Sequence, residues 1–131
     1  MTTSRIEIRE EGDIVEARRA VRDFTKEMGF GIVDQTKVAT AASELARNIY
    51  RYAKTGEVIM EEVEHPRGVK VTFRDRGPGI TDIGRALGEG YSTTAGSLGM
   101  GLPGAKRLMD EMTVESEPGK GTTVTILKHL S

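Results

Sequence analysis

Glycine is concentrated in the second half of this chain. Sixteen of the 131 residues are glycine, and eleven of them lie between Gly77 and Gly121. Glycine weakens helix and strand interiors but permits tight turns and close backbone contacts, so the second half of the chain needs backbone freedom. Residues 76–100 show no sustained hydrophobic periodicity. Because loops longer than about 15 residues in compact domains are usually lids or binding loops, we expect a lid.

Regular elements are predicted on both sides of this loop. Alternating apolar residues predict strands at 5–9, 57–65, 69–75, 113–117 and 121–128, and helical spacing predicts helices at 13–28, 34–53 and 102–111. Asp13 is expected to cap the first helix, and Gly29 to end it. The element order predicts an α/β fold, a two-layer sandwich in which helices cover one face of a mixed sheet.

Composition excludes several classes of protein. The formal net charge is −1, which gives no long-range field for nucleic acid. The chain has no cysteine, so a disulfide framework, a thiolate metal site and a cysteine nucleophile are all excluded. No apolar run approaches the ~20 residues of a membrane span. We expect one cytoplasmic domain over residues 1–131, with neither nucleic acid nor membrane as a partner.

The longest predicted helix carries a polar pair beside its apolar stripe. Glu44 and Asn48 are four residues apart, so their side chains lie on one face of the helix. In a cleft, the carboxylate of Glu44 has the chemistry of a general base, and the amide oxygen of Asn48 that of a Mg²⁺ ligand. The alternative is a solvated pair on the helix surface.

The strand at 69–75 ends in an aspartate followed by glycines. Asp75 precedes Gly77 and Gly79 in the stretch RDRGPGI. An ionised carboxylate only accepts hydrogen bonds, so in a pocket it would accept the exocyclic amine of adenine and repel the carbonyl oxygen of guanine. The same residue types also make ordinary surface turns, which is the competing interpretation.

The stretch GSLGMGL leads into the helix predicted at 102–111. Glycines before a helix N-terminus let an anion approach unpaired N–H groups, and a triphosphate is the natural ligand. The stretch contributes Gly96, Gly99, Met100, Gly101 and Leu102. It is not a Walker A loop, because no Gly-Lys-Ser/Thr follows, and it lacks the preceding strand of a dinucleotide-binding fold.

A second glycine pair lies near the C-terminal strand. Gly119 and Gly121 predict a tight hairpin turn, after which Thr122 opens the strand at 121–128. Taken alone, this stretch is only a hairpin.

As an ordered set, the four motifs resemble the boxes of the GHKL ATP-binding superfamily. They are E-x-x-x-N (Glu44, Asn48), D-x-G-x-G (Asp75, Gly77, Gly79), G-x-x-G-x-G-L (Gly96, Gly99, Gly101) and G-x-G-T (Gly119, Gly121, Thr122). The match spans roughly residues 5 to 128. Within the superfamily, TAASELARNIYRYA and GMGLPGAKRLMDE are similar to the stand-alone serine/threonine kinases of bacterial partner-switching pathways.

This resemblance implies a Bergerat-type α/β sandwich with an ATP lid, and ATP and Mg²⁺ as cofactors. It also implies that Asp75 contacts adenine with support from Thr122, that Asn48 binds Mg²⁺ and that Glu44 is the base. The phosphates would lie along the N–H groups near Gly99 to Leu102.

The resemblance further implies partners. The phosphate acceptor would be a serine or threonine of a STAS-domain antagonist protein, and the released kinase would activate a metal-dependent phosphatase. Two alternatives stay open: an anti-sigma factor kinase that binds a sigma factor directly, and a non-catalytic module that binds proteins under ATP control. The sequence also leaves a homodimer open.

The histidines and the basic residues bear on which branch of the superfamily the chain resembles. A histidine kinase needs a phosphoacceptor histidine on a dimerisation helix, whereas the only histidines, His65 and His129, lie in or beside predicted strands. Between Ile80 and Gly96 the sole basic residue is Arg85, so charge compensation for a transferred phosphoryl group must come from elsewhere. Candidate cations are Arg47, Arg51, Lys106 and Arg107.

Overall fold

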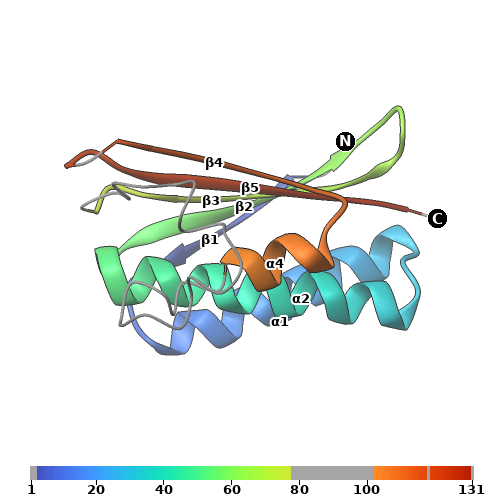
Figure 1. Cartoon of the computed structure of the whole chain (residues 1–131). Helices are drawn as coiled ribbons and strands as arrows, with labels where there is room; N and C mark the ends of the chain where they lie inside the picture. Colours follow the sequence, from blue (N-terminus) through green and yellow to red (C-terminus); the bar gives the residue numbers. More distant parts are fainter. Residues whose placement is uncertain (1–2, 78–101, 118, 131) are drawn as a thin grey trace.

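The computed structural model describes residues 3–77, 102–117 and 119–130 of the chain (Figure 1). Its elements, in chain order, are β1 (Thr3–Ile8), α1 (Gly12–Met28), α2 (Ile32–Asn48), the π-helix η1 (Ile49–Ala53), β2 (Gly56–Val63), β3 (Gly68–Asp75), α4 (Leu102–Leu108), β4 (Glu111–Glu117) and β5 (Gly121–His129). Each predicted strand and helix has a counterpart in this order.

The five strands form one sheet in the order β1-β2-β3-β5-β4. All four neighbouring pairs among these described strands are antiparallel, so the expectation of a mixed sheet was wrong. Strands β3 and β4 do run in the same direction, but β5 lies between them and pairs with both. Because β5 lies between them, β3 and β4 form no parallel pair, and each pairs with β5 in the antiparallel direction. The order of the elements along the chain does not reveal this arrangement.

The helices α1, α2 and α4 cover one face of this sheet, as Figure 1 shows. Antiparallel sheets with one covered face alternate apolar and polar residues along each strand. On β3, Val69, Val71 and Phe73 are buried, whereas Arg74 is exposed. The fold is therefore a two-layer α/β sandwich, as predicted.

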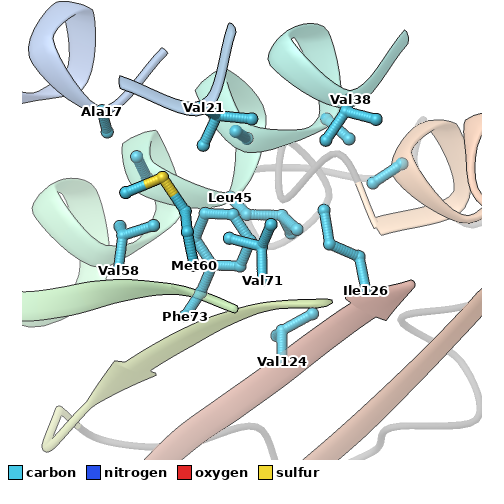
Figure 2. Packing of buried hydrophobic residues seen from close by; sticks show 14 of the residues in the cluster. Ala17, Val21, Val38, Leu45, Val58, Met60, Val71, Phe73, Val124 and Ile126 are labelled. Atoms are coloured by element: carbon cyan, nitrogen blue, oxygen red, sulfur yellow. The ribbon is translucent and has the colours of Figure 1, made fainter. Parts of the chain in front are cut away.

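The core lies between the sheet and the helices. Figure 2 shows Val58, Met60, Val71, Phe73, Val124 and Ile126 from the strands packed toward Ala17, Val21, Val38 and Leu45 from α1 and α2. Phe73 is the largest of the fully buried side chains and lies two residues before Asp75. The end of β3 is thus anchored in the core immediately before the predicted site.

Helix α1 differs from its prediction at one end. Gly29 ends it in the left-handed region, with φ of 98°, as predicted. Asp13, however, lies inside the first turn and does not cap the helix. Its carboxylate accepts hydrogen bonds from the N–H groups of Arg9 and Glu10, at 2.9 and 3.0 Å, and these bonds lower the pKa of Asp13. Asp13 therefore stabilises the turn between β1 and α1.

The long helix predicted at 34–53 is divided. It begins at Ile32, changes at Ile49 from α-helical to π-helical hydrogen bonding, and ends before Lys54, whose φ is 71°. Single π-helical turns occur preferentially at functional sites. The change follows directly after Asn48, one of the predicted site residues.

The last helix is shorter than predicted. Helix α4 ends at Leu108 because the backbone joins the sheet two residues later, where the N–H of Asp110 donates to the carbonyl oxygen of Leu127 at 3.0 Å. The strand expected from residue 113 accordingly begins at Glu111. None of the helices in the described ranges is long and apolar enough to cross a membrane.

Candidate active site

Asp75 connects the end of β3 with the start of β5. Its Oδ1 atom accepts two main-chain hydrogen bonds, from the N–H of Gly77 at 2.9 Å and from the N–H of Thr122 at 3.2 Å. Among the described residues, no hydrogen bond is made to Oδ2. Burial raises the pKa of Asp75 above its ordinary value, and the two hydrogen bonds partly offset this increase. Asp75 is thus a half-buried residue whose Oδ2 atom receives no hydrogen bond from the described part of the chain.

Two glycines allow the backbone to close around this aspartate. A Cβ atom on Gly77 would lie 2.6 Å from the Cβ of Ala53, at the end of η1. Gly121 has a φ of 116°, and a Cβ there would overlap the carbonyl oxygen of Asp75. Since real Cβ contacts are never this short, both positions require glycine. The D-x-G and G-x-G-T motifs are therefore in direct contact.

The hydroxyl of Thr122 is held by a residue from the neighbouring strand. Ser116 lies opposite Thr122 in the β4–β5 register, and the two hydroxyl oxygens are 2.9 Å apart. The Ser116 hydroxyl also donates to the carbonyl oxygen of Gly121 at 3.0 Å. Sequence reasoning missed Ser116, because only the register of the hairpin identifies it.

Asp75 lines two of the cavities that the described residues form. One, of about 280 Å³, is lined by Arg74, Asp75, Arg76, Glu115, Ser116, Lys120, Gly121, Thr122 and Thr123. The other, of about 260 Å³, is lined by Arg5, Glu7, Ile8, Arg9, Thr55, Gly56, Glu57, Arg74, Asp75 and Arg76. The structure therefore brings Asp75, Thr122 and Ser116 together at a solvent-accessible hollow. The described lining of these cavities does not include Glu44 or Asn48.

Glu44 and Asn48 lie on the last turns of α2 and are both half-buried. Glu44 Oε1 is 2.8 Å from Nη1 of Arg47, with both side chains about two-fifths exposed. The π-helix that continues α2 contacts Gly77 through Ala53. The same continuous segment thus carries the polar pair and reaches the residues that follow Asp75.

The remaining predicted residues divide into two groups. Leu102 begins α4, and its side chain is buried in the core rather than in a pocket. Gly79, Gly96, Gly99, Met100 and Gly101 lie outside the described residues, as do Ile80 and Arg85.

Both histidines lie away from Asp75. His65 is in the turn between β2 and β3, and His129 pairs with Gly68 at the opposite end of β3 from Asp75. Neither histidine lies on a helix.

The protein oxygen ligands in this region suit a Mg²⁺ ion that is coordinated mainly by the phosphates of a bound nucleotide. In the described part of the chain, no group of three or more His, Cys, Asp or Glu side chains is placed to hold a metal ion. Mg²⁺ commonly uses one or two protein oxygens and completes its octahedron with phosphate and water. Asn48, with one amide oxygen, fits such a site, and Oδ2 of Asp75 fits the adenine amine.

Comparison with known proteins identifies the family. A model described as "Histidine kinase-, DNA gyrase B-, and HSP90-like ATPase" matches residues 33–131. The Serine/threonine-protein kinase RsbT of Bacillus subtilis (strain 168) is 49% identical over 127 residues, which cover 95% of each protein. The Anti-sigma F factor of Geobacillus thermodenitrificans (strain NG80-2) is 35% identical over 122 residues, covering 88% of this chain and 83% of that relative.

Solved structures show the same fold at low identity. The RsbU and RsbW domains of Rv1364c from Mycobacterium tuberculosis match with a TM-score of 0.70 and 20% identity, over 99% of this chain and 33% of that one. The SiaB-SiaC complex from Pseudomonas aeruginosa matches with a TM-score of 0.60 and 11% identity, over 98% and 89%. The chain belongs to the histidine kinase-, DNA gyrase B- and HSP90-like ATPase (GHKL) family and, within it, to the serine/threonine-protein kinases related to RsbT and the anti-sigma F factors.

Proposed function

We propose that this kinase transfers a phosphoryl group from Mg-ATP to a serine or threonine of a STAS-domain antagonist protein. The observation that carries the proposal is the geometry of Asp75, whose Oδ1 is held by two main-chain N–H groups while no described residue donates to Oδ2. A fixed, half-buried acceptor of this kind suits the amine of adenine. The absence of cysteine keeps a reducing cytoplasm as the proposed compartment.

Asn48 and Glu44 are proposed to serve the phosphate end. Bound Mg-ATP supplies the phosphoryl group and compensates its charge. Asn48 would hold the ion through its amide oxygen, and the phosphates would lie along the N–H groups near Gly99 to Leu102. Glu44 would take the proton of the incoming hydroxyl as the hydroxyl oxygen bonds to the γ-phosphorus and ADP leaves.

Arg47 is the candidate cation that the structure associates with the proposed base. Its guanidinium is 2.8 Å from Glu44, and an ion pair this exposed contributes at most about 1 kcal/mol. Arg47 can therefore leave Glu44 at little cost and turn toward a phosphate. Residues 80–96 contain a single basic residue, Arg85. We propose that Arg47 supplies further positive charge to the transferred phosphoryl group.

The partners are proposed from relatives. The relative with 49% identity is named a serine/threonine-protein kinase, which favours a switch kinase that acts on a STAS-domain protein and, once released, activates a metal-dependent phosphatase. Identities of 32–35% to anti-sigma F factors support the second candidate, a kinase that also binds a sigma factor. A pull-down with a sigma factor separates the two.

The decisive test is the intact mass of a purified STAS-domain protein encoded beside this chain, after incubation with Mg-ATP and the kinase. We expect the mass of one added phosphate with the wild type and no addition with Glu44→Gln. Glu27→Gln, an exposed glutamate on α1, is the matched control and should behave as the wild type. Transfer at the wild-type rate by Glu44→Gln would show that Glu44 is not the base. ATP binding without transfer to any STAS-domain protein would favour the ATP-controlled binding module.

A further inference from the structure

The hydroxyl of Ser116 contacts the start of β5 at the edge of the Asp75 pocket. Its hydroxyl oxygen is 3.0 Å from the carbonyl oxygen of Gly121 and 2.9 Å from the hydroxyl oxygen of Thr122. Both partners belong to the start of β5, which pairs with β4 at this point. Ser116 is thus the cross-strand neighbour of a residue that lines the pocket.

These two contacts fix the direction of the hydroxyl groups. A serine hydroxyl has one hydrogen, and a carbonyl oxygen has none to donate. Both contacts are therefore hydrogen bonds at the same time only when Ser116 donates to Gly121 and Thr122 donates to Ser116. With its hydrogen used in this way, the oxygen of Thr122 presents only lone pairs to the pocket.

The carboxylate of Asp75 adds a second acceptor beside the hydroxyl oxygen of Thr122. The N–H of Thr122 donates to Oδ1 of Asp75, which ties the two residues together, and no described residue donates to Oδ2. Both side chains line the same cavity of about 280 Å³. This pair therefore contributes two acceptors to the cavity lining, Oδ2 of Asp75 and Oγ1 of Thr122, whereas Arg74, Arg76 and Lys120 contribute side-chain donors to the same lining.

We propose that Ser116 is a positioning residue for purine selection, which holds the Thr122 hydroxyl as an acceptor so that the pocket prefers a 6-amino purine to a 6-oxo purine. The inference rests on the proposed function, because it places adenine at Asp75. An amine at C6 supplies two hydrogens for two acceptors, whereas a carbonyl at C6 would face them with lone pairs. Without Ser116 the Thr122 hydroxyl can rotate and donate to that carbonyl, so the discrimination falls.

The test compares the dissociation constants of ATP and ITP, which carry the same triphosphate and differ at C6 and in the hydrogen that the 6-oxo purine carries on N1, by calorimetry on the full chain. Ser116→Ala should lower the ratio of the ITP constant to the ATP constant about tenfold, the effect of one hydrogen bond. Ser116→Thr restores a hydroxyl and should keep the wild-type ratio. Thr113→Ala removes an exposed β4 hydroxyl that faces Thr125 in the register and should leave the ratio unchanged.

Further variants cover the remaining outcomes. If Ser116→Ala does not fold, Ser116→Cys, whose thiol is a weak donor, should show the same reduced ratio. In a Thr122→Val background, Ser116→Ala should change the ratio no further, since the hydroxyl that it orients is gone.

Two results would overturn the inference while leaving the proposed function intact. One is a wild-type preference for ATP that Ser116→Ala and Ser116→Cys retain in full. The other is an equal loss of affinity for both nucleotides, which would indicate a purely structural role for Ser116. A wild-type chain that binds no ATP would instead refute the proposed function itself.

Discussion

Oδ1 of Asp75 accepts a hydrogen bond from the main-chain N–H of Thr122 at 3.2 Å, although the two residues are 47 positions apart in the sequence. The antiparallel pairing of β3 with β5 places the end of one strand beside the start of the other. Because the bond uses the backbone of Thr122, the Thr122 side chain stays available to the pocket. This bond therefore positions two predicted adenine contacts with respect to each other.

Replacing Asp75 with asparagine should weaken ATP binding without preventing folding. An amide oxygen can still accept the N–H bonds of Gly77 and Thr122, but an amide nitrogen would replace the other carboxylate oxygen. We expect the dissociation constant for ATP to rise about 10- to 100-fold, the usual effect of losing a hydrogen bond to a charged group. Calorimetric titration measures this, with the exposed Asp23→Asn on α1 as control. An unchanged affinity for ATP would show that Asp75 does not contact adenine.

The same variant should alter the pH dependence of stability. Burial raises the pKa of Asp75 in the folded state, so its favourable contribution is fully present below the ordinary value of 3.8 and is lost as pH rises through the folded pKa. The free energy of unfolding of Asp75→Asn, relative to the wild type, should therefore increase with pH from about pH 3 upward. Urea denaturation at several pH values tests the sign of this slope.

Gly77→Ala should destabilise the fold and weaken ATP binding together. The new methyl group would lie 2.6 Å from the Cβ of Ala53, and overpacking of this kind typically costs about 1–3 kcal/mol. Gly104→Ala in α4, where a Cβ meets nothing within 4 Å, is the control and should stabilise the helix slightly. Adding Ala53→Gly to Gly77→Ala should recover part of the lost melting temperature. A Gly77→Ala variant as stable as the wild type would contradict the contact.

Arg47→Ala should slow phosphoryl transfer more than it weakens ATP binding. We expect a decrease of at least about tenfold in the single-turnover rate, in line with the loss of one charge-compensating group, and a stability change below about 1 kcal/mol, as for other exposed ion pairs. Arg19→Ala is a close control, because Arg19 pairs with Glu16 on α1 at the same i, i+3 spacing and at 3.1 Å. Equal rates for both variants would exclude Arg47 from catalysis.

Asp110→Asn should cost stability only above acidic pH. The carboxylate accepts the N–H of His129 at 2.7 Å, and this bond, with smaller contributions from Lys128, lowers the pKa of Asp110. Its stabilisation is therefore present above the ordinary value of 3.8 and is lost as pH falls through the folded pKa. The melting temperatures of variant and wild type should differ near neutral pH and converge in acid. A difference independent of pH would show that charge is not involved.

Local patterns were sufficient to predict the strands, the helix boundary at Gly29 and the position of Asp75 at a strand end. They failed at two helix ends, where hydrogen bonds outside the helix compete with those that the helix would use. Asp13 has the side chain of a helix cap, but the N–H groups of Arg9 and Glu10 bind its carboxylate first. The end of α4 is likewise set by the bond from Asp110 to Leu127 in β5, not by helical propensity.

The site shows the same division between local and distant information. The spacing of Asp75 and Gly77 predicts a turn with an acceptor, and the Gly121-Thr122 pair predicts a hairpin, but neither pattern reveals that they touch. Ser116 has no local signal at all, since its role depends on lying opposite Thr122. Such contacts follow from strand order and register, which a single sequence does not determine.

The place of β5 between β3 and β4 has a consequence for how this protein is made. Chains emerge from the ribosome N-terminus first, so Asp75 and Gly77 are synthesised well before the strand that donates to Asp75. Until Gly121 and Thr122 arrive, the sheet lacks an interior strand and the aspartate lacks its partner from β5. A ligand stabilises only a state that can bind it. If the nucleotide binds at Asp75 as proposed, it can protect this kinase only after β5 has joined the sheet.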